Sequence, residues 1–130
     1  MAVVGTKGQQ VDLLIRQGAS LGPVACRLTN PDTSPMNLTG ATIRAQIRKT
    51  ASDALSTGAA AVCTVTNAAN GEFTYEFTVE DTTLLTADAT SESAPASVYV
   101  WDMELEDSVG RVTPLVYGTV NVFRGVTKTP

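Results

Sequence analysis

Four acidic residues close together in the chain have the side chains best suited to binding a cation. They are Asp102, Glu104, Glu106 and Asp107. A hard cation such as calcium takes several oxygen ligands, so this cluster could form a metal site. Alternate residues of a β-strand, however, line one face of a sheet, and a face in contact with water commonly carries charge. We therefore interpret the cluster as a solvent-facing strand and predict no metal site.

The chain has little of the chemistry that catalysis requires. It contains no histidine, the usual general base, so neither Cys26 nor Cys63 has a histidine to activate it. No glycine-rich phosphate-binding loop occurs. A two-carboxylate hydrolase needs only Asp and Glu, but the acidic residues lie on turns or at alternating solvent-facing positions. We predict that the protein is not an enzyme and has no catalytic residue and no cofactor.

The charge balance argues against polyanionic partners. The 130 residues include 9 basic and 13 acidic side chains, which gives a formal net charge of −4. No domain-wide positive field is therefore available to hold nucleic acid or an anionic membrane. The first residues lack the apolar stretch of a secretory signal, and no segment has the length of a membrane span. We expect a protein that folds in a reducing cytoplasm and binds neither nucleic acid nor membrane.

Most of the chain alternates apolar with polar residues, which is typical of half-buried β-strands. In the clearest segment, residues 41–49, Ile43 faces one side and Arg44 faces the other. Turn-forming residues close each segment, and the pair Asn70-Gly71 supplies the positive φ of a hairpin turn. The predicted strands cover residues 11–16, 21–29, 41–49, 62–66, 72–79, 98–106, 111–117 and 118–123.

This spacing of strands favours an all-β fold, namely an antiparallel, immunoglobulin-like β-sandwich of about seven to nine strands. A barrel or a jelly roll remains an alternative. One short helical turn is expected near residues 80–85, because Glu80 and Asp81 suit the positive end of a helix dipole. Aromatic side chains that recur at strand period are expected in the core. They are Phe73, Tyr75, Phe77, Tyr99 and Trp101.

The predicted domain occupies residues 10–125. Residues 1–9 are small, polar and glycine-containing, so we expect an extended N-terminal arm outside the core. Residues 126–130 form a C-terminal tail. Pro23 and Pro114 should mark an edge or a bulge, because proline cannot donate to a β-ladder. Cys26 and Cys63 are interpreted as two small core side chains rather than a disulfide.

Six sequence phrases follow one another in a set order. They are VDLLIRQG at 11–18, MNLTGATIRAQIR at 36–48, NGEFT at 70–74, VYVWDMEL at 98–105, GRV at 110–112 and GTVNV at 118–122. As an ordered set they resemble a family of small tailed-bacteriophage virion proteins, similar also to the N-terminal module of phage baseplate upper proteins. The resemblance covers residues 10–127, and only the insertion at 86–96 departs from it, where a short turn is expected.

The resemblance implies a bacteriophage virion structural protein without enzymatic activity. Such a protein is an adaptor in the tail, baseplate or head–tail region that docks in multiple copies onto other virion proteins. It forms a homo-oligomer in the assembled particle, which is built in the host cytoplasm. A capsid decoration protein is an alternative within the same class.

The expected partner interface combines the chain ends with exposed strand residues. Loose termini and unpaired strand edges can become ordered against a neighbour. Arg44 and Arg48 could form a basic stripe, although a solvated sheet face is the simpler interpretation. Phe123, if exposed, could anchor a partner chain. The candidate interface residues are Val3, Val4, Lys7, Arg44, Arg48, Phe123 and Val126.

A module that binds a host receptor or carbohydrate is the alternative from a different class. It predicts an exposed aromatic side chain near acids or amides in the loops at 50–59 or 86–96. Neither segment contains an aromatic residue, which counts against this hypothesis.

Overall fold

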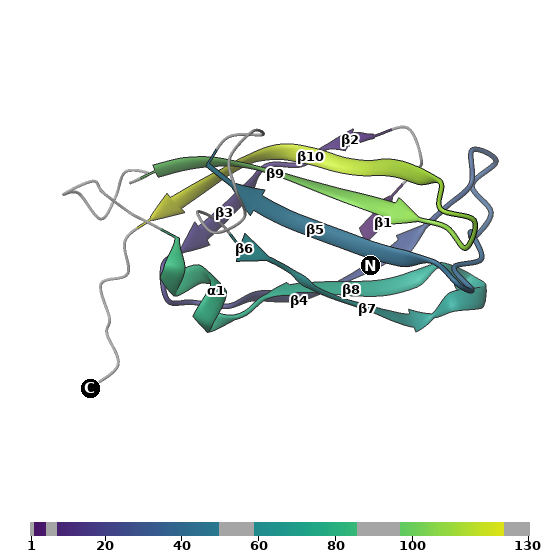
Figure 1. Cartoon of the computed structure of the whole chain (residues 1–130), viewed down its shortest axis with the longest axis horizontal. Coiled ribbons are helices and arrows are strands. Elements are labelled where there is room, and N and C mark those ends of the chain that lie inside the picture. The colour runs from purple at the N-terminus through teal and green to yellow at the C-terminus, as the bar shows by residue number, and fades with distance from the viewer. Residues whose placement is uncertain (1, 5–7, 50–58, 86–96, 124–130) are drawn as a thin grey trace.

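The chain folds into two β-sheets packed face to face, as Figure 1 shows. The computed structural model describes residues 2–4, 8–49, 59–85 and 97–123. Its strands are β1 (Ala2–Val4), β2 (Gln9–Gln10), β3 (Leu13–Arg16), β4 (Leu21–Leu28), β5 (Thr42–Arg48), β6 (Ala59–Ala60), β7 (Val62–Asn67), β8 (Glu72–Phe77), β9 (Ser97–Glu106) and β10 (Val112–Phe123). A 3₁₀ turn, η2 (Ala68–Asn70), precedes β8, and a helix, α1 (Val79–Leu84), follows it.

Alternating polarity places the apolar side chains between the sheets. Along β8, the side chains of Phe73, Tyr75 and Phe77 are buried and those between them are half-buried. Tyr99 and Trp101 of β9 enter the same core, and the Tyr75 and Trp101 ring centroids lie 5.8 Å apart. Full burial of a side chain of this size contributes about 1.5–3 kcal/mol. The predicted aromatic core is thus confirmed.

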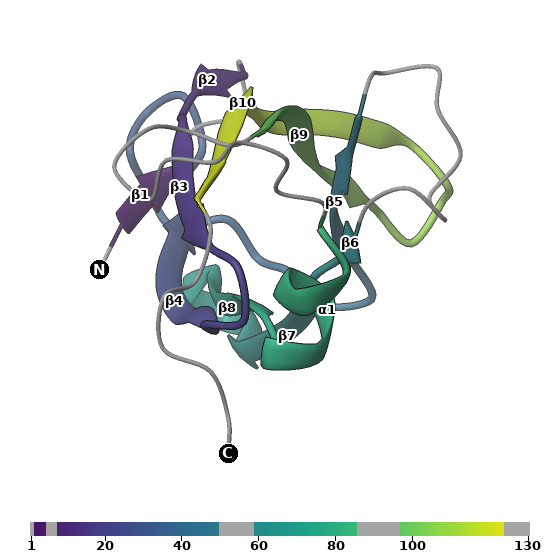
Figure 2. The ribbon, with the colours of Figure 1, turned by 90° about the vertical axis from the view of Figure 1, so that its left-hand side faces the viewer.

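The strand order confirms an immunoglobulin-like β-sandwich. One sheet has the order β1-β4-β8-β7, and the other has the order β2-β10-β9-β5-β6 with β3 also on β10. Every pair formed between two of the strands β4 to β10 is antiparallel. In this part the order matches strands B-E-D and G-F-C-C′ of immunoglobulin variable domains. Figure 2 shows the two layers from one end of the sandwich.

The N-terminal residues differ from the predicted free arm. Residues 2–4 are extended, but as β1 they pair in parallel with β4, with Val4 opposite Leu28. The Val4 side chain is only 5% exposed and belongs to the core. A strand edge left open by β4 supplies the hydrogen bonds that hold this segment, because unpaired backbone groups attract an additional strand. The prediction that residues 1–9 lie outside the core is therefore wrong for Val4.

The predicted first strand, 11–16, runs alongside β10 but is regular only from Leu13 onward. Val11 and Asp12 separate β2 from β3, and both short strands pair in parallel with β10. The Val11 carbonyl turns toward the core and accepts a hydrogen bond of 2.7 Å from Trp101 Nε1. Asp12 Oδ1 accepts the Thr119 backbone N–H at 3.0 Å, which lowers the pKa of the Asp12 carboxyl. Asp12 Oδ1 thus accepts the hydrogen bond that a backbone carbonyl would accept in a regular ladder with β10.

The predicted turns and bulges are largely confirmed. The β4–β8 register shifts between Leu21 and Val24, around Pro23, and the β9–β10 register shifts beside Pro114. Gly71 has φ 69°, as predicted for the turn between β7 and β8, and the residues before it form the 3₁₀ turn η2. Strand β10 continues through the position where two separate strands, 111–117 and 118–123, are predicted. The irregularity in β10 lies instead at Leu115, where the ladder with β9 has a bulge.

The helix begins one residue earlier than predicted because Thr78 caps it. Thr78 Oγ1 accepts the Asp81 N–H at 3.3 Å, and Asp81 Oδ2 accepts the Thr78 N–H at 3.1 Å. This reciprocal capping box ends β8 at Phe77 and makes Val79 the first helical residue. Val79 is consequently exposed rather than part of the aromatic strand.

Both cysteines are free thiols that pack with the core. Cys26 is buried, and loss of water raises its pKa to about 11. The pKa of Cys63, which is half-buried, is raised for the same reason. The interpretation of the cysteines as small core side chains is confirmed.

Gly118→Ala should destabilise the sandwich by about 1–3 kcal/mol, because an added methyl group would overlap the Val11 carbonyl. Displacement of that carbonyl would also break its bond to the Trp101 indole. Urea unfolding and tryptophan emission of the folded protein measure the two effects. Gly110→Ala is the comparison variant: its methyl group would meet no atom within 4 Å, but its φ of 89° disfavours any side chain, so it should lose stability without changing the tryptophan emission. An unchanged emission spectrum in Gly118→Ala would contradict the role of this close approach.

Candidate functional site

A groove of about 620 Å³ lies on the outer, water-facing side of the β2-β10-β9-β5 sheet. Its floor is set by strand register, which aligns Gln10, Tyr117, Asp102 and Gln46 in one row across four strands. These side chains face outward because their sequence neighbours on β9 and β10 face the core. A phenol ring, a carboxylate and two amides therefore stand side by side.

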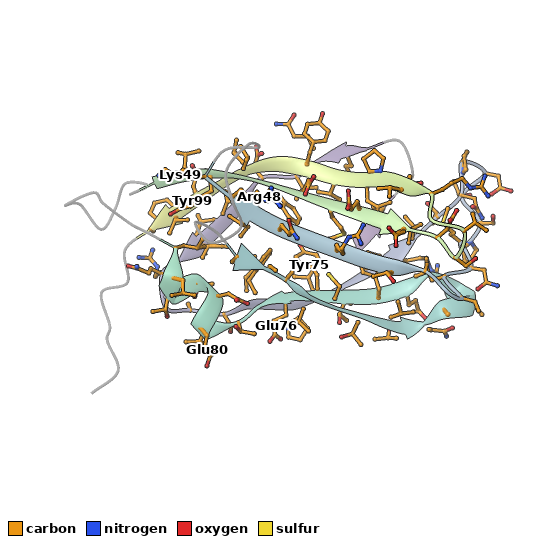
Figure 3. The ribbon with its side chains drawn as sticks, in the orientation of Figure 1. Arg48, Lys49, Tyr75, Glu76, Glu80 and Tyr99 are labelled. Atoms are coloured by element: carbon orange, nitrogen blue, oxygen red, sulfur yellow. The ribbon has the colours of Figure 1, made fainter. Side chains whose placement is uncertain are left out.

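Two further rows flank the first. On one side, Glu104 is the register partner of Arg44. On the other side, Arg48 is opposite Val100, which is in turn opposite Thr119. Figure 3 labels Arg48 at the end of β5. The next residue is Lys49, and its ammonium lies 4.7 Å from the centroid of the Tyr99 ring. Lys49 and Tyr99 are not part of the groove lining, which combines polar side chains of both charges around one exposed aromatic ring, that of Tyr117.

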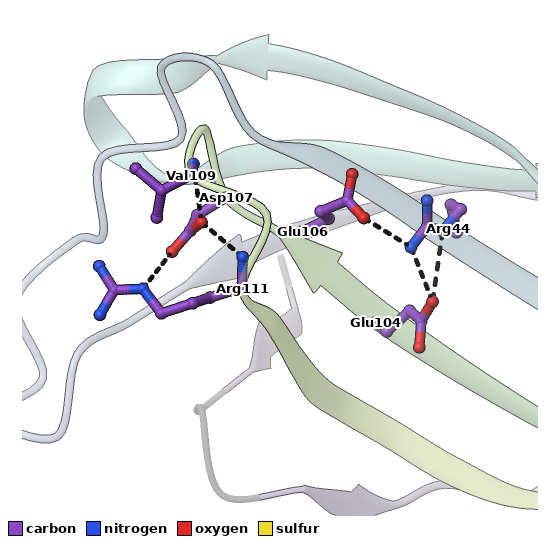
Figure 4. Close-up of polar contacts among 6 residues, drawn as sticks. All are labelled: Arg44, Glu104, Glu106, Asp107, Val109 and Arg111. Carbon is purple, nitrogen blue, oxygen red and sulfur yellow. Dashed lines mark hydrogen bonds and ion pairs between the residues drawn. The ribbon is translucent and has the colours of Figure 1, made fainter.

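The charges in the groove are balanced. Arg44 donates to Glu104 Oε1 at 2.9 Å and to Glu106 Oε1 at 3.4 Å (Figure 4). These bonds raise the pKa of the Arg44 guanidinium. Loss of water raises the pKa of the Asp102 carboxyl, and the neighbouring Glu104 charge adds to this increase, whereas Arg48 opposes it. The fold thus disfavours the ionised form of Asp102.

The predicted acidic cluster is divided between two separate networks. Glu104 and Glu106 share Arg44, whereas Asp107 accepts the Val109 and Arg111 backbone N–H groups at 3.0 and 2.9 Å within a turn (Figure 4). Arg111 also forms an ion pair of 3.3 Å with Asp107. Within residues 2–4, 8–49, 59–85 and 97–123, no group of three or more His, Cys, Asp or Glu side chains could hold a metal ion.

The candidate interface residues do not form one surface. Arg44 and Arg48 both line the groove, as the basic-stripe hypothesis requires, but acids balance their charge. Val4 is buried, which contradicts its prediction as a surface residue, and Val3 is placed only by its backbone in β1. Phe123 is half-buried, and the Arg16 guanidinium lies 5.7 Å from its ring centroid. Lys7 and Val126 lie outside the described residues.

Sequence reasoning missed Tyr117, the most exposed aromatic side chain. It is 54% exposed, because the bulge at Leu115 shifts the alternation of β10 and turns Tyr117 to the outer face. Only the register of four strands, which is not local in sequence, brings Gln10 and Gln46 into its row. The loops that the receptor hypothesis singled out, 50–59 and 86–96, lie outside the described residues except for Ala59, which belongs to β6.

The segment Gly18-Ala19-Ser20-Leu21-Gly22 has the Gly-x-Ser-x-Gly spacing of a nucleophile elbow. In hydrolases this motif joins a strand to a helix and exposes the serine beside a histidine. Here it spans the exposed turn after β3 and the first two residues of β4, in a chain without histidine. The motif therefore lacks both the structural context and the general base of a serine hydrolase.

The strand order and the open outer face define the class of this protein, an immunoglobulin-like β-sandwich. No model of a known protein family matches the chain, and no curated protein sequence matches it. None of the helical segments in the described ranges has the length and apolarity to cross a membrane. Function must therefore be inferred from the surfaces themselves, because β-sandwiches serve many functions.

Asp102→Asn should leave the free energy of unfolding at neutral pH equal to or above that of the wild type. Because the folded-state pKa of Asp102 is raised, its ionisation destabilises the fold as pH rises from 3.8 through that pKa. The neutral amide removes this penalty, so the two proteins should converge below pH 3.8. Urea unfolding over a range of pH measures the difference.

Asp12→Asn is the matched control, with the opposite sign. The folded-state pKa of Asp12 is lowered, so its contribution to stability is complete above 3.8 and is lost as pH falls through that pKa. The amide variant should therefore be less stable than the wild type at neutral pH. A lower stability of Asp102→Asn at neutral pH would contradict the raised pKa of Asp102.

Proposed function

We propose that this protein is a non-enzymatic structural component of a bacteriophage virion. It acts as a β-sandwich adaptor in the tail, baseplate or head–tail region and docks in multiple copies onto other virion proteins. The ordered phrases that resemble tailed-phage virion proteins support this proposal. A rigid sandwich that presents open strand edges is well suited to such repeated contacts.

The single observation that carries the proposal is the exposed edge of strand β7. Among the described strands, only β8 pairs with it, so its other side is a sheet edge. Its sequence, Val62-Cys63-Thr64-Val65-Thr66-Asn67, contains no charge and no proline. Val62 is 55% exposed and Val65 is 37% exposed. Natural proteins usually protect such an edge with lysine, proline or a bulge, because it is a template for a further strand. In β7 the register shifts only between Val65 and Asn67, so the stretch Val62–Val65 is regular and open.

An added strand would extend the β4-β8-β7 layer by main-chain hydrogen bonds. This mode of docking, β-augmentation, obtains affinity from the backbone and specificity from alternate side chains. The side chains of β7 are all uncharged, so they impose no charge requirement on an incoming strand. The N-terminal strand β1 uses the same chemistry at the opposite edge of this sheet.

Val62→Lys should reduce incorporation of the protein into virions at least about tenfold, the equivalent of 1.4 kcal/mol. A lysine on the edge strand opposes the approach of a further strand. Incorporation is measured by quantitative immunoblotting of purified particles of the phage that encodes the chain. Immunogold labelling of the same particles distinguishes a tail or baseplate position from capsid decoration.

Val109→Lys is the matched control. It makes the same substitution at a residue that is 71% exposed in the turn between β9 and β10. Its incorporation should equal that of the wild type, and circular dichroism should show the same β-rich fold for both variants. Absence of the wild-type chain from purified particles would overturn the structural assignment, and equal incorporation of both variants would overturn docking through β7.

A further inference from the structure

The groove on the outer face of the second sheet is not used by the proposed docking edge. Strand β7 belongs to the other sheet, whereas the groove spans β2, β10, β9 and β5. Its volume of about 620 Å³ is within the range of small-molecule sites, which extends from about 300 to 1,000 Å³. This surface can therefore serve a second function that is independent of incorporation into a particle.

The charge of the groove disfavours an ionic ligand. Two cations, Arg44 and Arg48, and two acids, Asp102 and Glu104, line it, so their formal charges cancel. Arg44 is already bonded to Glu104 at 2.9 Å, and Arg48 to Gln46 Oε1 at 2.8 Å. A phosphate or carboxylate ligand would have to compete with these contacts. A neutral ligand that forms hydrogen bonds would leave them intact.

The row across the groove matches the two kinds of surface on a sugar ring. Tyr117 is the exposed member of the seven aromatic residues of the chain, and the C–H face of a pyranose can pack on such a ring. Beside it, the Asp102 carboxylate accepts hydrogen bonds, and the amides of Gln10 and Gln46 both donate and accept. A sugar hydroxyl likewise both donates and accepts a hydrogen bond.

The spacing of the row also suits an oligosaccharide. Neighbouring strands of a sheet lie about 4.8 Å apart, so side chains on successive strands are separated by approximately one sugar ring. Tyr117 on β10, Asp102 on β9 and Gln46 on β5 occupy three successive strands. A chain of sugar units that crosses the strands would meet the aromatic ring first and the acid and amide next.

We propose that this groove binds a neutral oligosaccharide, with one sugar ring packed on Tyr117 and its hydroxyl groups bonded to Asp102 and Gln46. The site is on the rigid sheet rather than in the loops at 50–59 and 86–96. The ligand contacts a face whose side chains are held in place by strand register. Recognition consequently requires no rearrangement of the backbone.

A glycan array provides the first test, with the full-length protein as the probe. The array carries neutral hexose and N-acetylhexosamine oligosaccharides together with sialylated and sulfated ones. The expected result is binding to neutral members only. Binding to none of them, or to charged members alone, would overturn the proposal.

Calorimetric titration with the strongest neutral oligosaccharide then assigns the site. Tyr117→Ala should weaken binding at least tenfold, and Gln46→Ala should weaken it severalfold. Tyr117→Phe retains the ring and should bind nearly as well as the wild type. Leu84→Ala, at a residue that is 74% exposed on α1, is the matched control and should bind normally. Unchanged affinity in Tyr117→Ala would place the ligand elsewhere and overturn the assignment.

Incorporation into particles separates this inference from the proposed function. Tyr117→Ala should enter virions at the wild-type level, because β7 is unchanged, while losing saccharide binding. Loss of incorporation in this variant would show that the groove is a contact between virion proteins rather than a saccharide site. Normal incorporation without any saccharide binding in the wild type would overturn the inference and leave the structural assignment intact.

Discussion

The structure depends on strand β10, which forms hydrogen-bonded ladders along both of its sides. On one side it pairs antiparallel with β9 over most of its length, and on the other it pairs in parallel with β2 and then β3. The Val11 carbonyl lies against Gly118 and accepts a bond from Trp101 of β9. The absence of a side chain at Gly118 thus allows the N-terminal segment to approach β10 and β9 closely between β2 and β3.

This constraint also determines which side chains reach the outer surface. The bulge at Leu115 changes the phase of β10, so that Tyr117 points outward and Leu115 and Val116 are both buried. Register with β9 and β5 then aligns Asp102 and Gln46 with the exposed ring. The groove is therefore a product of the same pairing that closes the core. A change in register by one residue would exchange its polar side chains for core residues.

Local patterns in the sequence predict the strands well, because one face of each strand must be buried. The alternation along β5 and β8 is regular, and Pro23 and Pro114 mark irregularities that local chemistry makes necessary. The alternation of apolar and polar residues does not say which distant segments pair with each other. The parallel attachment of β1, the division at Val11 and the row around Tyr117 all depend on contacts between residues far apart in the chain.

The same limit applies to function. The sequence identifies Arg44 and Arg48 as outward-facing, but not the acids that neutralise them, since Glu104 is sixty residues from Arg44. Val4 is apolar and close to the terminus, so its position alone does not distinguish a free arm from a core strand. The Thr29 N–H donates a hydrogen bond of 2.9 Å to the Val4 carbonyl, and this contact between distant residues helps to hold Val4 in the core.

The raised pKa values of Cys26 and Cys63 have a practical consequence for chemical labelling. At physiological pH the Cys26 side chain remains protonated, since its pKa is about 11, and the pKa of Cys63 is also raised. The thiolate is the form that attacks alkylating reagents, so both native cysteines should react slowly while the protein is folded. A fluorescent maleimide would then modify an engineered surface cysteine selectively, without prior removal of either natural one.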